Sequence, residues 1–206
     1  GAGQRDELAK AFGKVYQNQD LVGPALDAFV ALTPWHASTC QIPNDNTPIL
    51  SIPNGLDLSL FAGEEERVPG RLLWTSNPNR GLMSAVRIFR KLRQRWPHFE
   101  LHIYGRSAVY GWSDSGDPMH EAPYLPDSDE PGVFLHDPLS KPKLARELMK
   151  AWALFYSCSW PETFAISVTE AQAAGAPVLS TPYGALPETV QGGILTYDFE
   201  RAVEEL

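Results

Sequence analysis

Short runs of β-branched and aromatic residues alternate with helix-like segments through most of this 206-residue chain. Strands separated by helices indicate βαβ units, in which neighbouring strands run parallel. The pattern therefore predicts an α/β fold, a parallel sheet with helices on both faces. The expected strands are residues 49–53, 71–76, 99–105, 132–137, 154–159, 177–181 and 193–197, and the expected helices are residues 81–95, 140–150 and 166–174. The first of these helices places four apolar side chains on one face: Leu82, Val86, Phe89 and Leu92.

The first 48 residues have a different pattern. Apolar residues recur there at near-helical spacing in two groups: Leu8, Phe12 and Val15, then Ala25, Phe29 and Leu32. The stretch from Ile42 to Pro48 is dense in turn-forming residues, which indicates a boundary. We predict a helical appendage or linker over residues 1–48 and the main domain over residues 49–206.

The composition excludes several functional classes. Hydrophobic residues make up 43% of the chain and charged residues 20%, as in an ordinary globular protein. A formal net charge of -8 argues against broad binding to nucleic acid or to an anionic membrane surface. The apolar stretches fall far short of the ~20 residues that a helix needs to span a bilayer. Cys40 and Cys158 are expected to be reduced thiols, which fits a cytoplasmic location.

The loops after the strands carry the candidate site, because ligands of open parallel sheets bind beyond the carboxyl ends of the strands. The loop Ser76-Asn-Pro-Asn-Arg-Gly81 brings Arg80 to a helix start, where a guanidinium and backbone N–H groups can meet a phosphate. Taken alone, Arg80 also fits a solvent-facing charge. Further along, Glu162 precedes a helix and Glu170 lies inside it. Unpaired N–H groups at that helix start offer an anion site: those near Thr163, Phe164 and Ala165.

The segment from Ser157 to Val178 resembles the donor-site signature of family 4 and related retaining glycosyltransferases of the two-domain GT-B architecture. Other motifs agree in order. Ile52-Pro-Asn-Gly-Leu-Asp57 is similar to the segment that enters the family's C-terminal domain, and residues 76–81 occupy the place of its basic phosphate loop. Leu101-His-Ile-Tyr-Gly105 resembles its next strand and glycine. The likeness covers roughly residues 49–197 and implies the Rossmann-like fold of a GT-B C-terminal, donor-binding domain.

The resemblance implies binding of a nucleotide-activated hexose, UDP- or GDP-linked, and its transfer to an acceptor with retained anomeric configuration, without a metal or other cofactor. Glu162 would bind hydroxyls of the donor sugar, and Glu170 those of the ribose. Arg80 would neutralise the leaving diphosphate, since breaking the anomeric C–O bond puts negative charge on the nucleotide. The other implied donor contacts are the amides of Thr163, Phe164 and Ala165 and the phosphate-loop residues Ser76 and Asn77.

The phosphate loop departs from the family pattern in one respect. Family members usually carry an Arg and then a Lys there, whereas this loop is short and only Arg80 matches. A second cation then comes from elsewhere or is missing; Arg106 and Lys141 are the candidates, and each also fits a plain surface charge. His136 follows a strand and either lines the base pocket or packs within the domain.

A metal site has little support in the sequence. The Asp127-Ser-Asp129 triplet fits the metal-binding pattern of the other major glycosyltransferase architecture, but no buried strand precedes it and a solvated acidic loop is the alternative. The five histidines show no helical pair or cysteine partner of metal-site type. Neither Gly-x-Gly-x-x-Gly nor Gly-x-Ser-x-Gly occurs, which argues against a dinucleotide site and a hydrolase elbow.

Two other functions stay open. A nucleotide-sugar epimerase uses a related two-domain fold, and a non-catalytic sugar-nucleotide-binding or scaffold module would explain the reduced basic loop. The paired glutamates and the Pro-Glu-Thr-Phe sequence favour transfer. The residues before position 49 are too few for a second Rossmann-like domain. We therefore expect the acceptor-binding N-terminal half to be missing and this chain alone to transfer little sugar.

Overall fold

The main body of the protein is a six-stranded parallel sheet. The computed structural model describes residues 27–40, 47–105, 126 and 129–205. The strands of the sheet are β3 (Arg71–Trp74), β4 (Glu100–Ile103), β5 (Val133–Leu135), β6 (Ala153–Tyr156), β7 (Val178–Ser180) and β8 (Gly193–Leu195). Their order is β5-β4-β3-β6-β7-β8, and every pairing is parallel. The chain thus builds outward in one direction from β3 and then in the other from β6, which is the order of a doubly wound, Rossmann-like fold.

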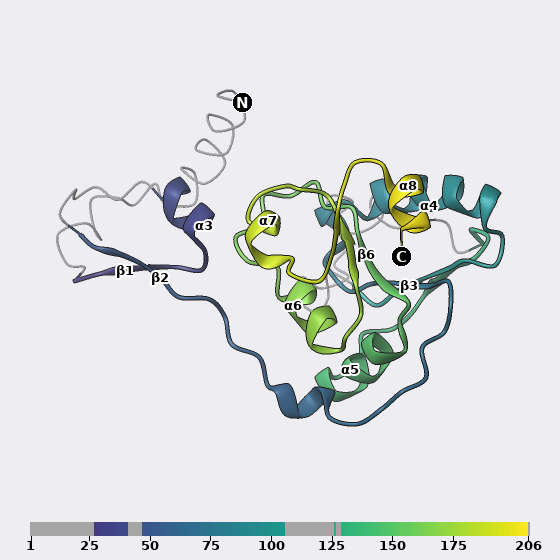
Figure 1. The fold of residues 1–206 in the computed structure, drawn as a ribbon, viewed down its shortest axis with the longest axis horizontal. Helices are drawn as coiled ribbons and strands as arrows, with labels where there is room; N and C mark the ends of the chain where they lie inside the picture. Colours follow the sequence, from purple (N-terminus) through teal and green to yellow (C-terminus); the bar gives the residue numbers. More distant parts are fainter. Residues whose placement is uncertain (1–26, 41–46, 106–125, 127–128, 206) are drawn as a thin grey trace, which may run out of the picture.

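Helices cover both faces of the sheet (Figure 1). Helices α4 (Leu82–Arg95) and α8 (Phe199–Glu204) pack together on one face, and α5 (Lys141–Lys150) and α6 (Ile166–Ala173) pack together on the other. The short helix α7 (Leu186–Thr189) connects β7 to β8. The predicted α/β fold with a parallel sheet and helices on both faces is therefore confirmed.

The core forms where the sequence pattern is most apolar. All four stripe residues of α4 are completely buried, and they face the central strands, whose side chains are buried on both sides of the sheet. A parallel sheet covered on both faces needs such continuous apolar strands. On the opposite side of α4, Arg87, Arg90 and Arg95 are exposed.

The N-terminal part differs from the expectation. β1 (Phe29–Ala31) and β2 (Ile49–Ser51) form a separate two-stranded parallel sheet, with α3 (Pro34–Thr39) between them. The helical interpretation of residues 25–32 was wrong, as was the assignment of residues 49–53 to the main sheet. A three-residue strand is too short to establish a periodicity, and its pairing with β2 decides its conformation. Residues 8–15 lie outside the described part of the chain.

The start of α3 hydrogen-bonds to the main domain. The Thr33 hydroxyl donates to the Thr163 carbonyl at 3.0 Å, and the Trp35 N–H donates to the Glu188 carboxylate at 3.0 Å. The β1–β2 pairing also crosses residue 48, where the sequence places a domain boundary, and that boundary stays a prediction. Within the described residues, no helix is both long and apolar enough to cross a bilayer.

Replacing Phe89 tests how far the fold depends on the α4 stripe. Phe89→Ala should lower the free energy of unfolding by about 3–5 kcal/mol, because it removes a fully buried ring and leaves a cavity. Arg87→Ala on the exposed side of the same helix should change it by less than about 0.5 kcal/mol. Urea denaturation followed by circular dichroism measures both. Equal losses in the two variants would contradict the assignment of the core.

Candidate functional site

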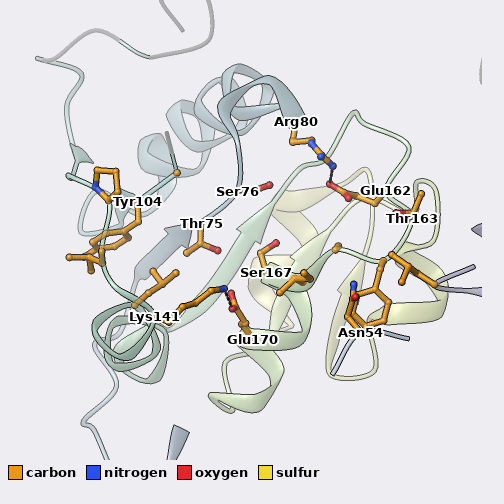
Figure 2. A pocket seen from close by; sticks show the side chains of 18 of the residues that line it. Asn54, Thr75, Ser76, Arg80, Tyr104, Lys141, Glu162, Thr163, Ser167 and Glu170 are labelled. Atoms are coloured by element: carbon orange, nitrogen blue, oxygen red, sulfur yellow. Dashed lines mark hydrogen bonds and ion pairs between the residues drawn. The ribbon is translucent and has the colours of Figure 1, made fainter. Parts of the chain in front are cut away.

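A pocket of about 680 Å³ lies beyond the carboxyl ends of β3 and β6. We call it the strand-end pocket. The loops that follow these strands form one wall, and the first turns of α5 and α6 form another (Figure 2). The strand order reverses between β3 and β6, and doubly wound sheets bind their ligands at this reversal.

Arg80 and Glu162 form an ion pair at one end of the strand-end pocket. Arg80 ends the 3-10 helix η3 (Pro78–Arg80), and its Nη1 lies 2.5 Å from Glu162 Oε1. The Tyr156 hydroxyl donates to the same carboxylate oxygen. Burial, followed by the neighbouring Cys158 and Glu162, raises the pKa of Tyr156 well above 10, so this hydroxyl keeps its proton. Glu162 is only 6% exposed and is held in place from two sides.

Lys141 and Glu170 form a second ion pair at the other end. Lys141 begins α5 and extends from an exposed position, whereas Glu170 comes from the buried side of α6 and is 8% exposed. The contact between α5 and α6 brings the two residues together although they are 29 positions apart. Among the described residues, the strand-end pocket therefore has two cations and two carboxylates, and each cation is paired with one carboxylate.

The start of α6 is shaped to present backbone N–H groups. Ala165 precedes the helix with φ of 61°, a left-handed conformation that residues other than glycine rarely adopt. No side chain caps this helix start. Thr163, Phe164, Ala165 and Ser167 all line the strand-end pocket. Unpaired N–H groups and the helix dipole make such a position favourable for an anion, and strained backbone is common at ligand sites.

The loop after β3 forms the floor of the strand-end pocket. The Ser76 carbonyl accepts from the Trp74 indole at 2.9 Å, and the Ser76 hydroxyl lies 3.3 Å from the Tyr156 hydroxyl. Gly105 packs so closely that a Cβ there would lie 1.7 Å from the Ser76 carbonyl oxygen. In the described part of the chain, the buried Thr75 hydroxyl makes no hydrogen bond, and it lines this pocket. A buried hydroxyl usually has a partner, so a bound ligand is the natural one.

Tyr104 closes the side next to α5, and a histidine stack lies behind it. His136 stacks on Tyr104 with ring centroids 4.4 Å apart and hydrogen-bonds His102 at 2.9 Å. His102 in turn contacts the Glu100 carboxylate at 3.1 Å. The Tyr104 hydroxyl donates to Glu147 at 3.0 Å, and burial together with that carboxylate raises the pKa of Tyr104 to about 12. The aromatic ring therefore faces the pocket as a rigid, uncharged surface.

A sequence comparison shows the family of the chain. The profile of the family described as "Glycosyl transferases group 1" matches residues 68–206, well over half of the chain. The chain belongs to the group 1 glycosyltransferases. No curated protein has a matching sequence.

Solved structures share the fold of this group 1 glycosyltransferase at low sequence identity. HepE from Anabaena, solved with UDP and glucose, matches with a TM-score of 0.67 and 15% identity, over 91% of this chain and 55% of that one. The pneumococcal O-GlcNAc transferase GtfA, solved with UDP and GlcNAc, matches with a TM-score of 0.59 and 17% identity, over 92% and 38%. A glycosyltransferase from Rickettsia africae gives a TM-score of 0.64 and 15% identity, over 95% and 55%. The fold is that of GT-B enzymes, and the chain spans roughly half or less of these structures.

Most of the predicted site residues of this glycosyltransferase lie together. The strand-end pocket is lined by Ser76, Arg80, Lys141, Glu162, Thr163, Phe164, Ala165 and Glu170. Asn77 does not line it; its side chain accepts from the Asn79 N–H at 3.0 Å and caps η3. His136 lies behind Tyr104 and does not line it either. Arg106, Asp127 and Ser128 lie outside the described residues.

Several lining residues were not predicted. Thr75, Tyr104, Ser167 and Asn54 all border the strand-end pocket, and Tyr156 supports Glu162 from below. Thr75 and Tyr104 each directly follow a strand, so the rule that ligands bind at strand ends could have included them. Tyr156 lies within a strand and looks like any core aromatic in the sequence.

The histidine stack predicts a pH dependence of stability. Burial, as the largest cause, lowers the pKa of both His102 and His136 below 6.5, so the folded state keeps them neutral. As pH falls through about 6.5, His102 and His136 bind protons in the unfolded chain but stay neutral in the folded chain. The free energy of unfolding therefore falls. The free energy of unfolding should therefore be lower at pH 5.5 than at pH 7.5. The His102→Gln, His136→Gln double variant should lose less over this interval, as measured by urea denaturation.

His98→Gln is the control for this measurement, because His98 is exposed. It should leave the pH dependence as in the wild type. A double variant at positions 102 and 136 that loses as much stability as the wild type would show that other groups cause the effect.

Proposed function

We propose that this chain is the donor-binding part of a retaining glycosyltransferase and binds a nucleotide-activated hexose in the strand-end pocket. One observation carries the proposal: two cations and two carboxylates, brought from four separate loops and helices, line a single pocket at the sheet reversal. A sugar nucleotide has the matching groups, a diphosphate for the cations and two sets of hydroxyls for the carboxylates.

The diphosphate would be held locally, because the chain as a whole carries a net charge of -8. Arg80 and the N–H groups at the start of α6 would take one part of it, and Lys141 would supply the second cation that the short phosphate loop lacks. Charge-assisted hydrogen bonds of this kind are about twice as strong as neutral ones. Arg106 remains a further candidate.

The carboxylates would hold the two sugars of the donor. Glu162, next to Arg80, would accept from hydroxyls of the transferred hexose, and Glu170, next to Lys141, from the ribose hydroxyls. HepE has been solved with UDP-glucose, and GtfA with UDP and GlcNAc, which supports a UDP-linked hexose over a GDP-linked one. His136 would act on the base indirectly, by stiffening Tyr104.

Donor binding in this proposal is an exchange of partners. In the structure each carboxylate is paired with a cation, so neither charge is left buried alone. The diphosphate would replace the carboxylates on Arg80 and Lys141, and the donor hydroxyls would replace the cations on Glu162 and Glu170. Every charged group keeps a partner in both states, which lowers the cost of emptying and filling the site.

Transfer would rely on Arg80 rather than on a metal. Cleavage of the anomeric C–O bond places negative charge on the leaving nucleotide, and a fixed guanidinium stabilises that charge without reorganising. The acceptor would bind on the far side of a cleft formed with a second domain, since this chain spans only 54%, 38% and 55% of three related solved structures. We accordingly propose that this chain alone transfers little sugar and that it acts in the cytoplasm.

Calorimetric titration with UDP, GDP and ADP tests the donor site. One nucleotide should bind, with no effect of EDTA. Glu170→Gln should weaken its binding by roughly 10-fold or more, because a charged hydrogen bond to the ribose contributes about 1.5–3 kcal/mol. Arg80→Gln should weaken binding of the nucleoside diphosphate but not binding of the corresponding nucleoside. The absence of binding by a folded wild-type chain would leave the scaffold function as the better one.

Glu65→Gln and Arg146→Gln are matched controls. These two residues form an exposed ion pair at 2.9 Å, outside the strand-end pocket. Neither substitution should change nucleotide binding by more than about twofold, since exposed ion pairs contribute little. Equal weakening in the controls and the site variants would indicate a general charge effect.

The stereochemistry of the product tests the mechanistic part. The full-length enzyme should give a glycoside with the anomeric configuration of the donor, which proton NMR coupling constants report directly during turnover. Glu162→Gln should lower kcat with the product configuration unchanged, because the residue holds the sugar at the reacting centre. An inverted product would refute retention while leaving the donor site intact.

A further inference from the structure

We propose that Trp160 is a positioning residue that holds the Arg80 guanidinium in place for the donor diphosphate. The proposal rests on the proposed function of Arg80 and adds a role for a residue that is not one of the predicted donor contacts. The guanidinium carbon of Arg80 lies 5.1 Å from the centroid of the Trp160 ring. Tryptophan is the strongest aromatic partner of a cation at this distance.

Trp160 is placed for this role rather than for the core. It is 43% exposed and is not among the buried residues of the core, so its ring is free to contact the guanidinium. Glu162, two positions later, binds the same guanidinium from another direction at 2.5 Å. The donor sugar would take over the Glu162 carboxylate, whereas nothing in the donor displaces the Trp160 ring. Trp160 is therefore a partner that Arg80 keeps when the pocket is occupied.

The loop that carries Trp160 is held rigid by its own contacts. The Trp160 N–H donates to Cys158 Sγ at 3.4 Å, and the Cys158 thiol donates to the Trp160 carbonyl at 3.2 Å. The Glu162 N–H donates to that carbonyl too, at 2.8 Å. Burial, with Glu162 as the next cause, raises the pKa of Cys158 to about 12, so the thiol keeps its proton and can donate. The ring is thus presented on a fixed backbone.

The same loop also holds the backbone of Arg80. The Ser159 N–H donates to the Arg80 carbonyl at 2.9 Å. Gly81 follows with φ of 121°, and a Cβ there would lie 2.6 Å from the Ser157 carbonyl oxygen, so only glycine allows the two loops to approach this closely. Residues 157–162 consequently contact Arg80 at both its backbone and its guanidinium.

A double-mutant cycle on Arg80 and Trp160 tests the proposal. The ligand is whichever of UDP, GDP and ADP the wild type binds most tightly, with its nucleoside as a second probe. Trp160→Leu should weaken diphosphate binding about two- to fivefold, the range for a partly exposed cation–π pair. Trp160→Phe should recover part of the loss. In an Arg80→Gln background, Trp160→Leu should cost nothing further, because the cation it positions is gone.

The nucleoside separates positioning from damage to the loop. Trp160→Leu should leave nucleoside binding unchanged, whereas a collapsed α6 start would weaken both ligands. Trp96→Leu is the matched control: Trp96 also stacks with an arginine, Arg95, at 4.8 Å, but it ends α4, 14 residues of helix away from Gly81. The Trp96→Leu variant should bind the nucleoside diphosphate and the nucleoside as tightly as the wild type does.

The outcomes are distinct. Additive losses of affinity in the cycle would overturn the positioning role and leave the proposed donor site intact. The same conclusion would follow if Trp160→Leu bound the diphosphate as tightly as the wild type while Arg80→Gln bound it more weakly. If the folded wild type binds no nucleoside diphosphate, the proposed function and the positioning role fall together. Thermal unfolding of each variant identifies any that fails to fold, and Trp160→Phe then carries the test.

Discussion

The pairing of β3 with β6 is the contact on which the site depends. Leu72 and Leu73 pair with Ala153 and Leu154 in parallel, so both strands end at the same edge of the sheet. The loops that follow therefore meet, and Arg80 reaches Glu162 across 82 positions of sequence. A reversal of strand order leaves a crevice at this edge, since the connections on either side diverge. The buried β3–β6 pairing therefore stabilises the sheet and also creates the crevice in which the strand-end pocket lies.

Charge neutralisation inside the pocket would allow this acidic chain to hold the proposed diphosphate. The chain has a net charge of -8, yet the strand-end pocket pairs each carboxylate with a cation. An unpaired buried carboxylate would either shift its pKa or destabilise the fold. The ion pairs leave no charge among the described pocket residues without a partner, and in the proposed function the diphosphate would take over their cations. For binding of the diphosphate, the two local ion pairs would therefore matter more than the net negative charge of the whole chain.

The sequence predicted the main sheet and most of the pocket because both rest on local signals. The α4 stripe, the turn at residues 76–81 and the two glutamates around the start of α6 are each readable within one short segment. Phe29 was assigned wrongly to a helix, and the strand at Ile49 was predicted correctly but assigned to the wrong sheet, because the pairing of the two is tertiary. Lys141 remained one of two candidates, since the α5–α6 contact that brings it to Glu170 is tertiary. Asn77 looked like a ligand but caps η3, a role with the same residue preference.

Cys158 shows how the buried polar groups of the site constrain one another. Its sulfur lies 4.0 Å from Glu162 Oε1, beside the Tyr156 hydroxyl that donates to the same oxygen. A thiolate or a phenolate there would repel the carboxylate, and burial raises the pKa of both groups so that they stay neutral. The Tyr156 hydroxyl and the Arg80 guanidinium consequently donate to the Glu162 carboxylate, and a neutral thiol lies beside it. Because these contacts share one carboxylate, Tyr156, Cys158, Glu162 and Arg80 act as a single hydrogen-bonded unit at the end of β6.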